Sequence, residues 1–311
     1  MNVLFDDDIK QKDKLNRGIG LGNFDGIHIG HRKLIDVLVH ECRERDIVSM
    51  VYTFNNHPDK ILEKQNVKLL TSNEMKLEIL ASLHLDSICL KTFDEDFANL
   101  EPEDFVRDIL VGRYGMKVAV TGFNYRFGRL GRGDIPLLRN MGKTCGFEVI
   151  CVPPVKAGEE IISSTAIREH IRNGEMQETS RMLGRPYSIR GKVEHGNRIG
   201  SEIGFPTANI IPVDDYAMPS NGVYFTRTTV DDVLFNSITN LGTKPTYGND
   251  SRRIIETHIF DFNGWLYGKE IDVHFIKRVR DELKYENAEE LKSQIVRDII
   301  SAVDYFNKEK S

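Results

Sequence analysis

Paired cysteines and long hydrophobic runs are both missing from this sequence of 311 residues. The four cysteines are scattered and form no C-x-x-C pair. That spacing excludes a zinc finger and a disulfide scaffold. The longest apolar runs fall far short of the roughly 18–20 residues that cross a bilayer, and the first residues lack the cationic start and apolar stretch of a targeting peptide. We therefore expect a cytoplasmic protein that does not associate with membranes.

An excess of charge of either sign is also absent. The 42 Lys and Arg residues nearly balance the 47 Asp and Glu residues, which gives a formal net charge of −5. No basic stripe or helix-turn-helix pattern occurs, so we expect no nucleic-acid partner. Low-complexity segments and internal repeats are missing as well. The length favours two domains, each large enough to bury its own core.

Up to about residue 184, short apolar runs alternate with segments of helical period. The pattern predicts helices after residue 28, near 74–83, after Pro102 and near 134–145. Such alternation is typical of a parallel sheet with helices on both faces, the doubly wound α/β class. Ligands of that class bind at the carboxyl ends of the strands. The predicted strands are 19–21, 47–54, 87–90, 118–121 and 147–152.

From residue 187 the pattern changes to β-rich stretches separated by turn residues. Regularly spaced short strands predict a small antiparallel barrel. Apolar residues at four-residue steps from Leu291 to Phe306 predict a closing helix that packs on this barrel. Gly184 and Pro186 are helix stop signals, so we expect two domains, 1–184 and 185–311. The predicted strands are 187–193, 222–230, 233–241, 253–262 and 270–276.

One motif stands directly between the first predicted strand and the first amphipathic helix. Unpaired backbone N–H groups and the positive end of the helix dipole, together with imidazoles and a glycine, suit a polyphosphate there. On the residues alone two alternatives stay open: the histidines cap the helix, or they form half of a metal site. The motif contains Gly22, Asn23, Phe24, Asp25, His28, Gly30 and His31.

Two further segments of the first half have polar groups that a nucleotide or flavin needs. Ser164 and Thr165 begin a predicted helix, with Arg168 one turn along, and could hold an anion or simply cap that helix. The segment from Asn124 to Phe127, which contains Arg126, follows a strand and could stack on a flat ring or belong to the core.

A third segment, Gly142-Lys143-Thr144, imitates the end of a P-loop. The P-loop pattern requires a glycine where this chain has Leu137, and the tripeptide sits in a helical segment rather than directly after a strand. We therefore expect no nucleotide site there.

The second half contains a glycine-rich stretch that leaves room for phosphate near the backbone, although such a stretch in a β domain is more often only a turn. Thr207 and Asn209 offer side-chain oxygens of the kind that Mg²⁺ accepts alongside phosphate and water. The residues of interest are Gly191, Gly196, Gly204, Pro206, Thr207 and Asn209.

These motifs carry a resemblance to a known family. The first one is similar to the His-x-Gly-His signature of the nucleotidyltransferase superfamily in its flavin-specific form, and the segments at 122–128 and 163–168 are similar to the same family in the same order. Gly204 to Asn209, with the segments at 219–224, 240–246 and 255–262, resembles the riboflavin kinase signature. The resemblance spans about residues 18–300 and is to the prokaryotic bifunctional riboflavin kinase/FMN adenylyltransferases, also called FAD synthetases.

The resemblance implies a Rossmann-like nucleotidyltransferase domain in 1–184 that transfers AMP from ATP to FMN, and a riboflavin kinase barrel in 185–311. His28 and His31 would act in adenylyl transfer, and Glu256 would be the base that activates the riboflavin hydroxyl. On sequence alone, Glu256 is equally well an ion-pair partner. The resemblance places the other motif residues around nucleotide and flavin, and Thr207 and Asn209 around Mg²⁺.

Riboflavin, FMN and ATP are accordingly the expected substrates, and FMN and FAD the products. The chain departs from the usual family pattern at Tyr125 and Lys244, and Asn124 is one of two residue types found at its position. Two alternatives stay open. In one, the chain is only a riboflavin kinase and its first domain binds nucleotide or flavin without catalysis. In the other, it is a flavin-responsive regulator, which the lack of DNA-binding patterns disfavours.

Overall fold

The computed structural model describes residues 2–6, 15–61, 67–195, 204–245 and 251–309. Contacts between Cα atoms divide the chain into two units, Met1–Ser164 and Thr165–Ser311. The division by contacts falls after the first residue of α7 (Ser164–Asn173), so the rest of this helix and α8 (Met176–Leu183), which the sequence pattern assigns to the first domain, group with the second unit. The predicted functional boundary after residue 184 stays a prediction.

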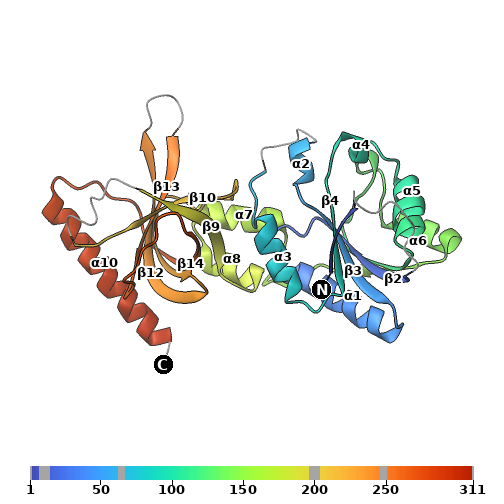
Figure 1. Cartoon of the computed structure of the whole chain (residues 1–311), viewed down its shortest axis with the longest axis horizontal. Coiled ribbons are helices and arrows are strands. Elements are labelled where there is room, and N and C mark those ends of the chain that lie inside the picture. The colour runs from blue at the N-terminus through green and yellow to red at the C-terminus, as the bar shows by residue number, and fades with distance from the viewer. Residues whose placement is uncertain (1, 7–14, 62–66, 196–203, 246–250, 310–311) are drawn as a thin grey trace. The chain divides into compact units, whose positions relative to one another are not determined.

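A parallel sheet of six strands forms the centre of the first unit (Figure 1). Every pair of neighbouring strands is parallel, which confirms the predicted fold class. The strand order is β1-β4-β3-β2-β5-β6, so the chain leaves β2 toward one edge through β3 and toward the other through β5. The carboxyl ends of β2 and β5 are thus the switch point where this class binds ligands. The strands are β1 (Asn2–Phe5), β2 (Arg17–Leu21), β3 (Val48–Phe54), β4 (Ser87–Lys91), β5 (Met116–Gly122) and β6 (Glu148–Val152).

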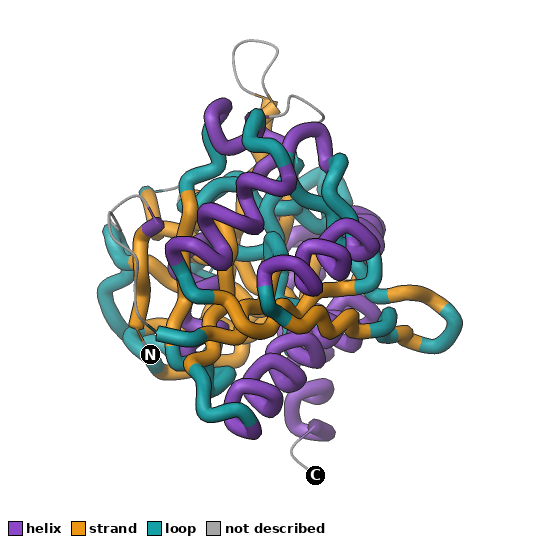
Figure 2. The backbone as a smooth tube through the Cα atoms, turned by 90° about the vertical axis from the view of Figure 1, so that its right-hand side faces the viewer, coloured by secondary structure: helices purple, strands orange, loops and turns teal. Residues whose placement is uncertain are grey.

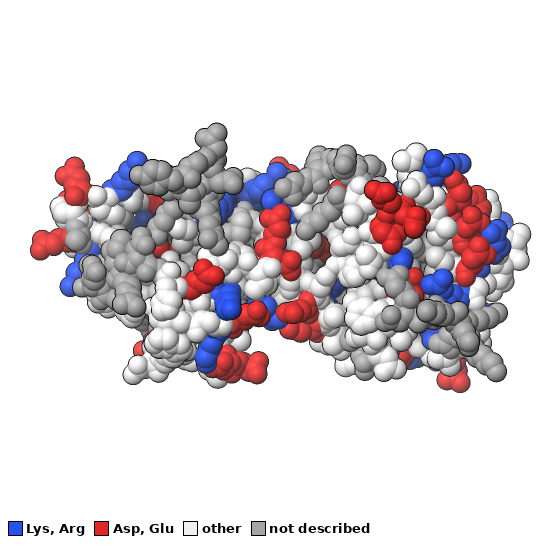
Figure 3. Space-filling view, turned by 45° about the horizontal axis from the view of Figure 1, so that its top comes forward, with Lys and Arg blue, Asp and Glu red and all other residues white. Residues whose placement is uncertain are grey.

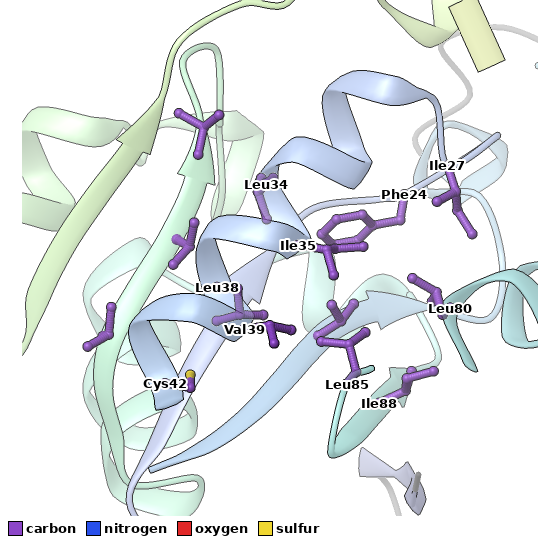
Figure 4. Close-up of a cluster of buried hydrophobic side chains, with 14 of the residues drawn as sticks. Phe24, Ile27, Leu34, Ile35, Leu38, Val39, Cys42, Leu80, Leu85 and Ile88 are labelled. Carbon is purple, nitrogen blue, oxygen red and sulfur yellow. The ribbon is translucent and has the colours of Figure 1, made fainter. Parts of the chain in front are cut away.

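Helices bury apolar side chains on both faces of this sheet. Figure 4 shows one cluster, in which α1 (Ile29–Glu44) contributes Leu34, Ile35 and Leu38, and α3 (Asn73–Ala81) contributes Leu80. The π-helix η2 (Phe105–Arg113) and α6 (Ile135–Cys145) cover the opposite face. Shorter elements are α2 (Pro58–Ile61), α4 (Glu95–Ala98), α5 (Pro102–Asp104), η3 (Arg129–Gly131), β7 (Lys156–Ala157) and β8 (Glu160–Ile161).

The second unit is a closed antiparallel barrel with the strand order β10-β13-β12-β11-β14-β9. The long helix α10 (Ala288–Glu309) lies against its outer face, where Phe306 and Ala302 pack on Val223 and Phe225 (Figures 1 and 2). Both the barrel and its helix agree with the sequence prediction. The strands are β9 (Tyr187–Glu194), β10 (Ala208–Pro212), β11 (Gly222–Val230), β12 (Val233–Pro245), β13 (Ser251–Ile259) and β14 (Glu270–Arg280).

Hydroxyl groups, rather than apolar side chains alone, fill part of the barrel interior. Thr228, Ser237, Thr226, Thr239 and Thr257 are fully buried, and each hydroxyl oxygen lies 2.8–2.9 Å from the next in that order. The five residues come from the inner faces of β11, β12 and β13. Because each hydroxyl both donates and accepts, the chain satisfies polar groups that would otherwise be costly to bury.

Charged side chains of both signs are interspersed on the face shown in Figure 3. Among the described residues, no helix is both long and apolar enough to cross a membrane.

Candidate functional site

The segment that follows β2 forms a tight turn with an unusual backbone. Phe24, Gly26 and Ile27 have φ angles of 49°, 80° and 39°, a left-handed region that non-glycine residues rarely adopt. The side chains of Phe24 and Ile27 are fully buried in the cluster of Figure 4. Their burial holds the turn, residues 22–28, in this conformation.

Polar contacts tie the same turn to two distant parts of the chain. The Asp25 carboxylate accepts a hydrogen bond from the Leu70 N–H at 3.1 Å, and the Gly26 N–H donates to the Thr71 hydroxyl at 3.3 Å. The Ser164 hydroxyl donates to the Asp25 carbonyl oxygen at 2.9 Å. Two predicted site residues that are 139 positions apart, Asp25 and Ser164, are therefore in direct contact.

The two histidines of the motif are stacked at the start of α1. His28 caps the helix, because its Nδ1 accepts the His31 N–H at 3.2 Å. The two imidazole rings lie 3.6 Å apart at an angle of 14°. A Cβ atom at Gly30 would come within 3.1 Å of the His28 ring, so glycine leaves room for this arrangement. Capping, one of the two alternatives left open by the sequence, is thus one real role of His28.

The surroundings of His31 favour its neutral form. Burial lowers the pKa of His31 well below its ordinary value, and the neighbouring His28 and Lys76 lower it further. Because His28 Nδ1 accepts a hydrogen bond, the proton of a neutral His28 ring is on Nε2. His31 Nδ1 is buried and makes no hydrogen bond with the described residues.

Other features of the α1 N-terminus also favour a bound anion. The first turn of α1 has no acidic residue. The arrangement therefore offers neutral nitrogen groups and the positive end of a helix dipole to an anionic ligand. Among the described residues, no group of three His, Cys, Asp or Glu side chains could hold a metal ion.

The turn after β5 follows the strand next to β2, on the other side of the switch point. Asn124 and Arg126 are exposed, and Arg126 lies 3.7 Å from the Asp134 carboxylate. The rings of Tyr125 and Phe127 are stacked with centroids 5.5 Å apart, and both pack on the core beneath. The core alternative therefore holds for these two aromatic rings, while the polar side chains between them stay accessible.

Ser164 is the first residue of α7, and the other predicted residues of its motif follow on the same helix. Thr165 is exposed and Arg168 is half-buried one turn later. The tripeptide that imitates a P-loop, Gly142 to Thr144, lies near the end of α6 and not after a strand.

A row of polar side chains crosses three strands on the outer face of the barrel. Glu256 on β13 is paired directly with Asn209 on β10 and with Asn240 on β12. Residues that are opposite one another in an antiparallel pair have Cβ atoms about 4.5–5.5 Å apart. The inner positions of β10, Ala208 and Ile210, are buried, so Thr207 and Asn209 share the outer face with Glu256.

His258 holds the segment that contains Thr207. Its Nδ1 lies 2.8 Å from the Pro206 carbonyl oxygen, and because a carbonyl only accepts, Nδ1 is the donor. The Phe205 ring meets the His258 ring edge to face at 5.9 Å. These contacts fix the start of β10 beside β13, next to the pair of Asn209 and Glu256.

A pocket of about 330 Å³ opens between the barrel and α10, on the same outer face. Along β13 the outer positions run from Glu256 to His258, and Phe260 follows directly after the strand. Glu256 is therefore about 7 Å along the strand from the pocket wall. The pocket is lined by Asn236, His258, Phe260, Asp261, Ile299, Val303, Phe306 and Asn307. Its lining combines apolar side chains with polar ones such as Asn236 and Asp261, which suits a flat, partly aromatic ligand with polar edges.

The predicted glycines differ in their surroundings. Gly191 is buried in β9, where a Cβ would come within 2.4 Å of Ile210 and 2.7 Å of the Ile211 carbonyl oxygen. It therefore allows β9 and β10 to approach closely, which is a packing role. Gly204 is exposed before Pro206. Gly196 lies outside the described residues.

Sequence reasoning did not select the residues that hold these sites together. Thr71, just before α3, and Lys76, on α3, act on the turn from 45 or more positions away in sequence, and no local pattern indicates such contacts. The pocket residues His258 and Phe260 follow Glu256 at steps of two. Because side chains alternate along a strand, this spacing predicts that the three side chains share one face.

The comparisons with known proteins cover both units. The family model described as FAD synthetase matches residues 10–166, and the one described as riboflavin kinase matches residues 183–306. The bifunctional riboflavin kinase/FMN adenylyltransferase of Buchnera aphidicola from Schizaphis graminum is 35% identical over 296 residues, which cover 94% of this chain and 95% of that protein. The protein of the same name from Escherichia coli is 35% identical over 292 residues, 93% of each chain.

A solved structure has a similar fold over nearly the whole chain. It is titled as a macrolide-efflux protein from Streptococcus pneumoniae, and it matches with a TM-score of 0.88 at 30% identity. The match covers 97% of this chain and 99% of that chain.

Proposed function

The chain belongs to the family of bifunctional riboflavin kinase/FMN adenylyltransferases, and we propose that it uses two separate sets of residues for the two reactions. It phosphorylates riboflavin to FMN with ATP, and it adenylylates FMN to FAD with release of pyrophosphate. The observation that carries the assignment is that both family models match, in order, across the chain. The alternative of a kinase with a non-catalytic first domain is not favoured.

The outer face of the barrel is the proposed kinase site. The riboflavin 5′-hydroxyl is a poor nucleophile while it keeps its proton, so this reaction needs a base. Glu256 is the proposed base, because it lies beside Asn209, about 7 Å along β13 from a pocket that suits the flavin ring. With the flavin ring in this pocket, the ribityl chain would extend along β13 toward Glu256.

Magnesium is the proposed metal of the kinase site. The donor set fits this ion, because Thr207, just before β10, and Asn209, on β10, offer two side-chain oxygen atoms two positions apart, and Mg²⁺ usually takes few protein ligands and completes its shell with phosphate and water. When bound, the ion would offset negative charge on the ATP phosphates. His258 would keep Thr207 in place through its hydrogen bond to Pro206.

Substitution of Thr207 by Ala tests this assignment. We expect the kinase KM for magnesium-ATP to rise about tenfold, because one oxygen ligand is lost, while FAD formation from supplied FMN stays the same. A titration with Mg²⁺ at fixed ATP measures the effect. Thr229→Ala, on the outer face of β11, is the matched control. Equal losses in both reactions of Thr207→Ala would instead indicate misfolding.

The proposed adenylyltransferase site is built on the turn 22–28. The FMN phosphate is already an anion near neutral pH, since its second pKa is about 6, so its attack on the ATP α-phosphorus needs no base. Positioning and charge stabilisation are sufficient. His28, His31 and the N-terminus of α1 would bind phosphate oxygens. Ser164 contacts the turn directly.

The remaining motif residues complete the proposal for this reaction. Thr165 and Arg168 add donors from α7, and Asn124 and Arg126 face the flavin or nucleotide after β5. Gly22, Asn23 and Phe24 form the backbone of the turn.

Two fragments test where the kinase begins. Residues 185–311 contain the whole barrel and α10, and we expect them to form FMN. Residues 165–311 also contain α8, which packs on β9 and β14 and buries Met182 and Leu183. Each such side chain contributes about 1.5–3 kcal/mol. We therefore expect the longer fragment to unfold at a temperature about 10 °C higher or more. A folded 185–311 fragment that makes no FMN would show that the kinase needs residues before 185.

Incubation of the whole chain with riboflavin, ATP and Mg²⁺ tests the overall assignment. FMN should appear first and FAD should follow, and omission of Mg²⁺ should stop both reactions. FMN without FAD, even when FMN is supplied, would support the kinase-only alternative. We also propose that the enzyme acts in the cytoplasm, since all four cysteines are free thiols, as is usual in a reducing compartment.

A further inference from the structure

Lys76 is a buried cation beside the turn 22–28. Its side chain is 6% exposed, on the first turns of α3. The Nζ atom donates to the Phe54 carbonyl oxygen at 3.0 Å and to the Asn23 carbonyl oxygen at 3.4 Å. Phe54 ends β3 and Asn23 belongs to the turn, so one ammonium group joins three elements at the carboxyl edge of the sheet.

The contact with Asn23 determines the orientation of one peptide group. The Asn23 carbonyl oxygen accepts a second hydrogen bond, from the Thr53 hydroxyl at 2.9 Å. Two donors on one carbonyl fix the plane of the peptide between Asn23 and Phe24. Because a peptide is planar and trans, the Phe24 N–H points away from Lys76. Phe24 is also the first residue of the turn with a left-handed backbone, at φ 49°.

Burial of the charged Lys76 side chain costs folding free energy that an apolar residue at this position would not cost. Burial lowers its pKa below the ordinary value, while Asp25, itself 3% exposed, acts in the opposite direction. A buried charge also acts more strongly on its neighbours than an exposed one, because the local dielectric constant is low. The ammonium therefore adds positive potential where α1 begins, on the same side as the positive end of its dipole.

We propose that Lys76 is a positioning residue for adenylyl transfer, which holds the turn 22–28 against the end of β3 without touching the substrate. Through this turn it sets the position of the α1 N-terminus, with His28 and His31, relative to the bound phosphates. The inference rests on the proposed adenylyltransferase function of the first unit.

The test compares Lys76→Met, Lys76→Arg and the control Lys117→Met in the full chain. Methionine nearly conserves shape but removes the charge and the donors, whereas arginine keeps both. Lys117 is exposed near the amino end of β5, at the opposite edge of the sheet from the switch point. FAD formation from supplied FMN, FMN formation from riboflavin, and thermal unfolding are measured for each variant.

We expect Lys76→Met to lower kcat for FAD formation 10- to 100-fold, because small displacements of positioned groups have effects of that size. The KM for ATP should change less than threefold, kinase activity should stay within twofold, and Lys76→Arg should recover most of the loss. Hydrogen exchange of the amides in residues 23–28 should become faster in Lys76→Met and not in Lys76→Arg.

Three results of the activity and unfolding measurements would overturn the proposal: full FAD formation by Lys76→Met, equal losses in the two Lys76 variants, or parallel losses of both activities with a lower unfolding temperature. The wild-type chain separates this test from that of the proposed function. If it makes no FAD from supplied FMN, the adenylyltransferase assignment fails. Unchanged hydrogen exchange at 23–28 in Lys76→Met contradicts the positioning role whatever the activity.

Discussion

Glu256→Gln should reduce FMN formation by about 10²–10⁴-fold, the usual contribution of a general base. Glutamine nearly conserves the shape of the side chain and its pairing with Asn209 and Asn240 across the sheet, but its amide cannot accept the proton of the riboflavin hydroxyl. FAD formation from supplied FMN should persist, because its phosphate nucleophile is already ionised. The two activities of one chain thus provide an internal control, measured by separating FMN and FAD in the same reactions.

Glu270→Gln is the matched control, an exposed glutamate at the start of β14 on the same barrel. It should leave both rates within twofold of the wild type. If Glu256→Gln keeps most of the kinase activity, Glu256 is not the base. A loss of FAD formation in the same variant would indicate general damage to the fold.

His31→Phe should lower FAD formation from FMN about 10²–10³-fold, as removal of one preorganised donor does in other active sites. Phenylalanine keeps a ring that can stack on His28, so the change removes mainly the two ring nitrogens. His31 Nδ1 is buried without a hydrogen bond to the described residues, and such an atom costs folding free energy. The unfolding temperature should therefore stay the same or rise while activity falls.

The control for this variant is His40→Phe, an exposed histidine on the same helix, α1. It should change neither reaction, and His31→Phe should leave the kinase unchanged. A loss of stability that parallels the loss of activity would show that His31 serves packing. Unchanged FAD formation would remove it from the proposed site.

The sequence predicts the two folds well, because their signals are local. Buried strands such as Val48–Phe54 are largely apolar runs, and barrel strands such as Gly222–Val230 alternate between the inner and outer faces. Besides the two-residue strands β7 and β8, one strand of the parallel sheet and one of the barrel escape that reasoning. Asn2–Phe5 is a short and largely exposed edge strand, and Ala208–Pro212 lies within a motif of Gly, Pro, Thr and Asn that reads as a loop.

The candidate sites are less predictable, because they depend on contacts between distant segments. The hydrogen bond from Ser164 to Asp25 joins residues 139 positions apart, and no spacing rule leads to it. Alternation along β13 places Glu256 on the outer face of the barrel. Its neighbours Asn209 and Asn240 can be identified only from the strand order and register. Lys76 is an ordinary member of a charged helix in the sequence, and its burial appears only in the folded chain.

The hydroxyl chain inside the barrel has a consequence for its protons. Five hydroxyls share four hydrogen bonds, and each has one proton to give but can accept two, so no oxygen donates to both neighbours and the links from the two ends converge on one oxygen of the chain. Reversal of the link beside that oxygen moves the meeting point by one hydroxyl, so the proton order changes in single steps along the row. These protons are closed off from water, so they should exchange slowly enough for hydroxyl resonances to be seen by NMR. The exchange rate of these side-chain hydroxyl protons would then measure opening of the barrel interior directly, without use of the backbone amides.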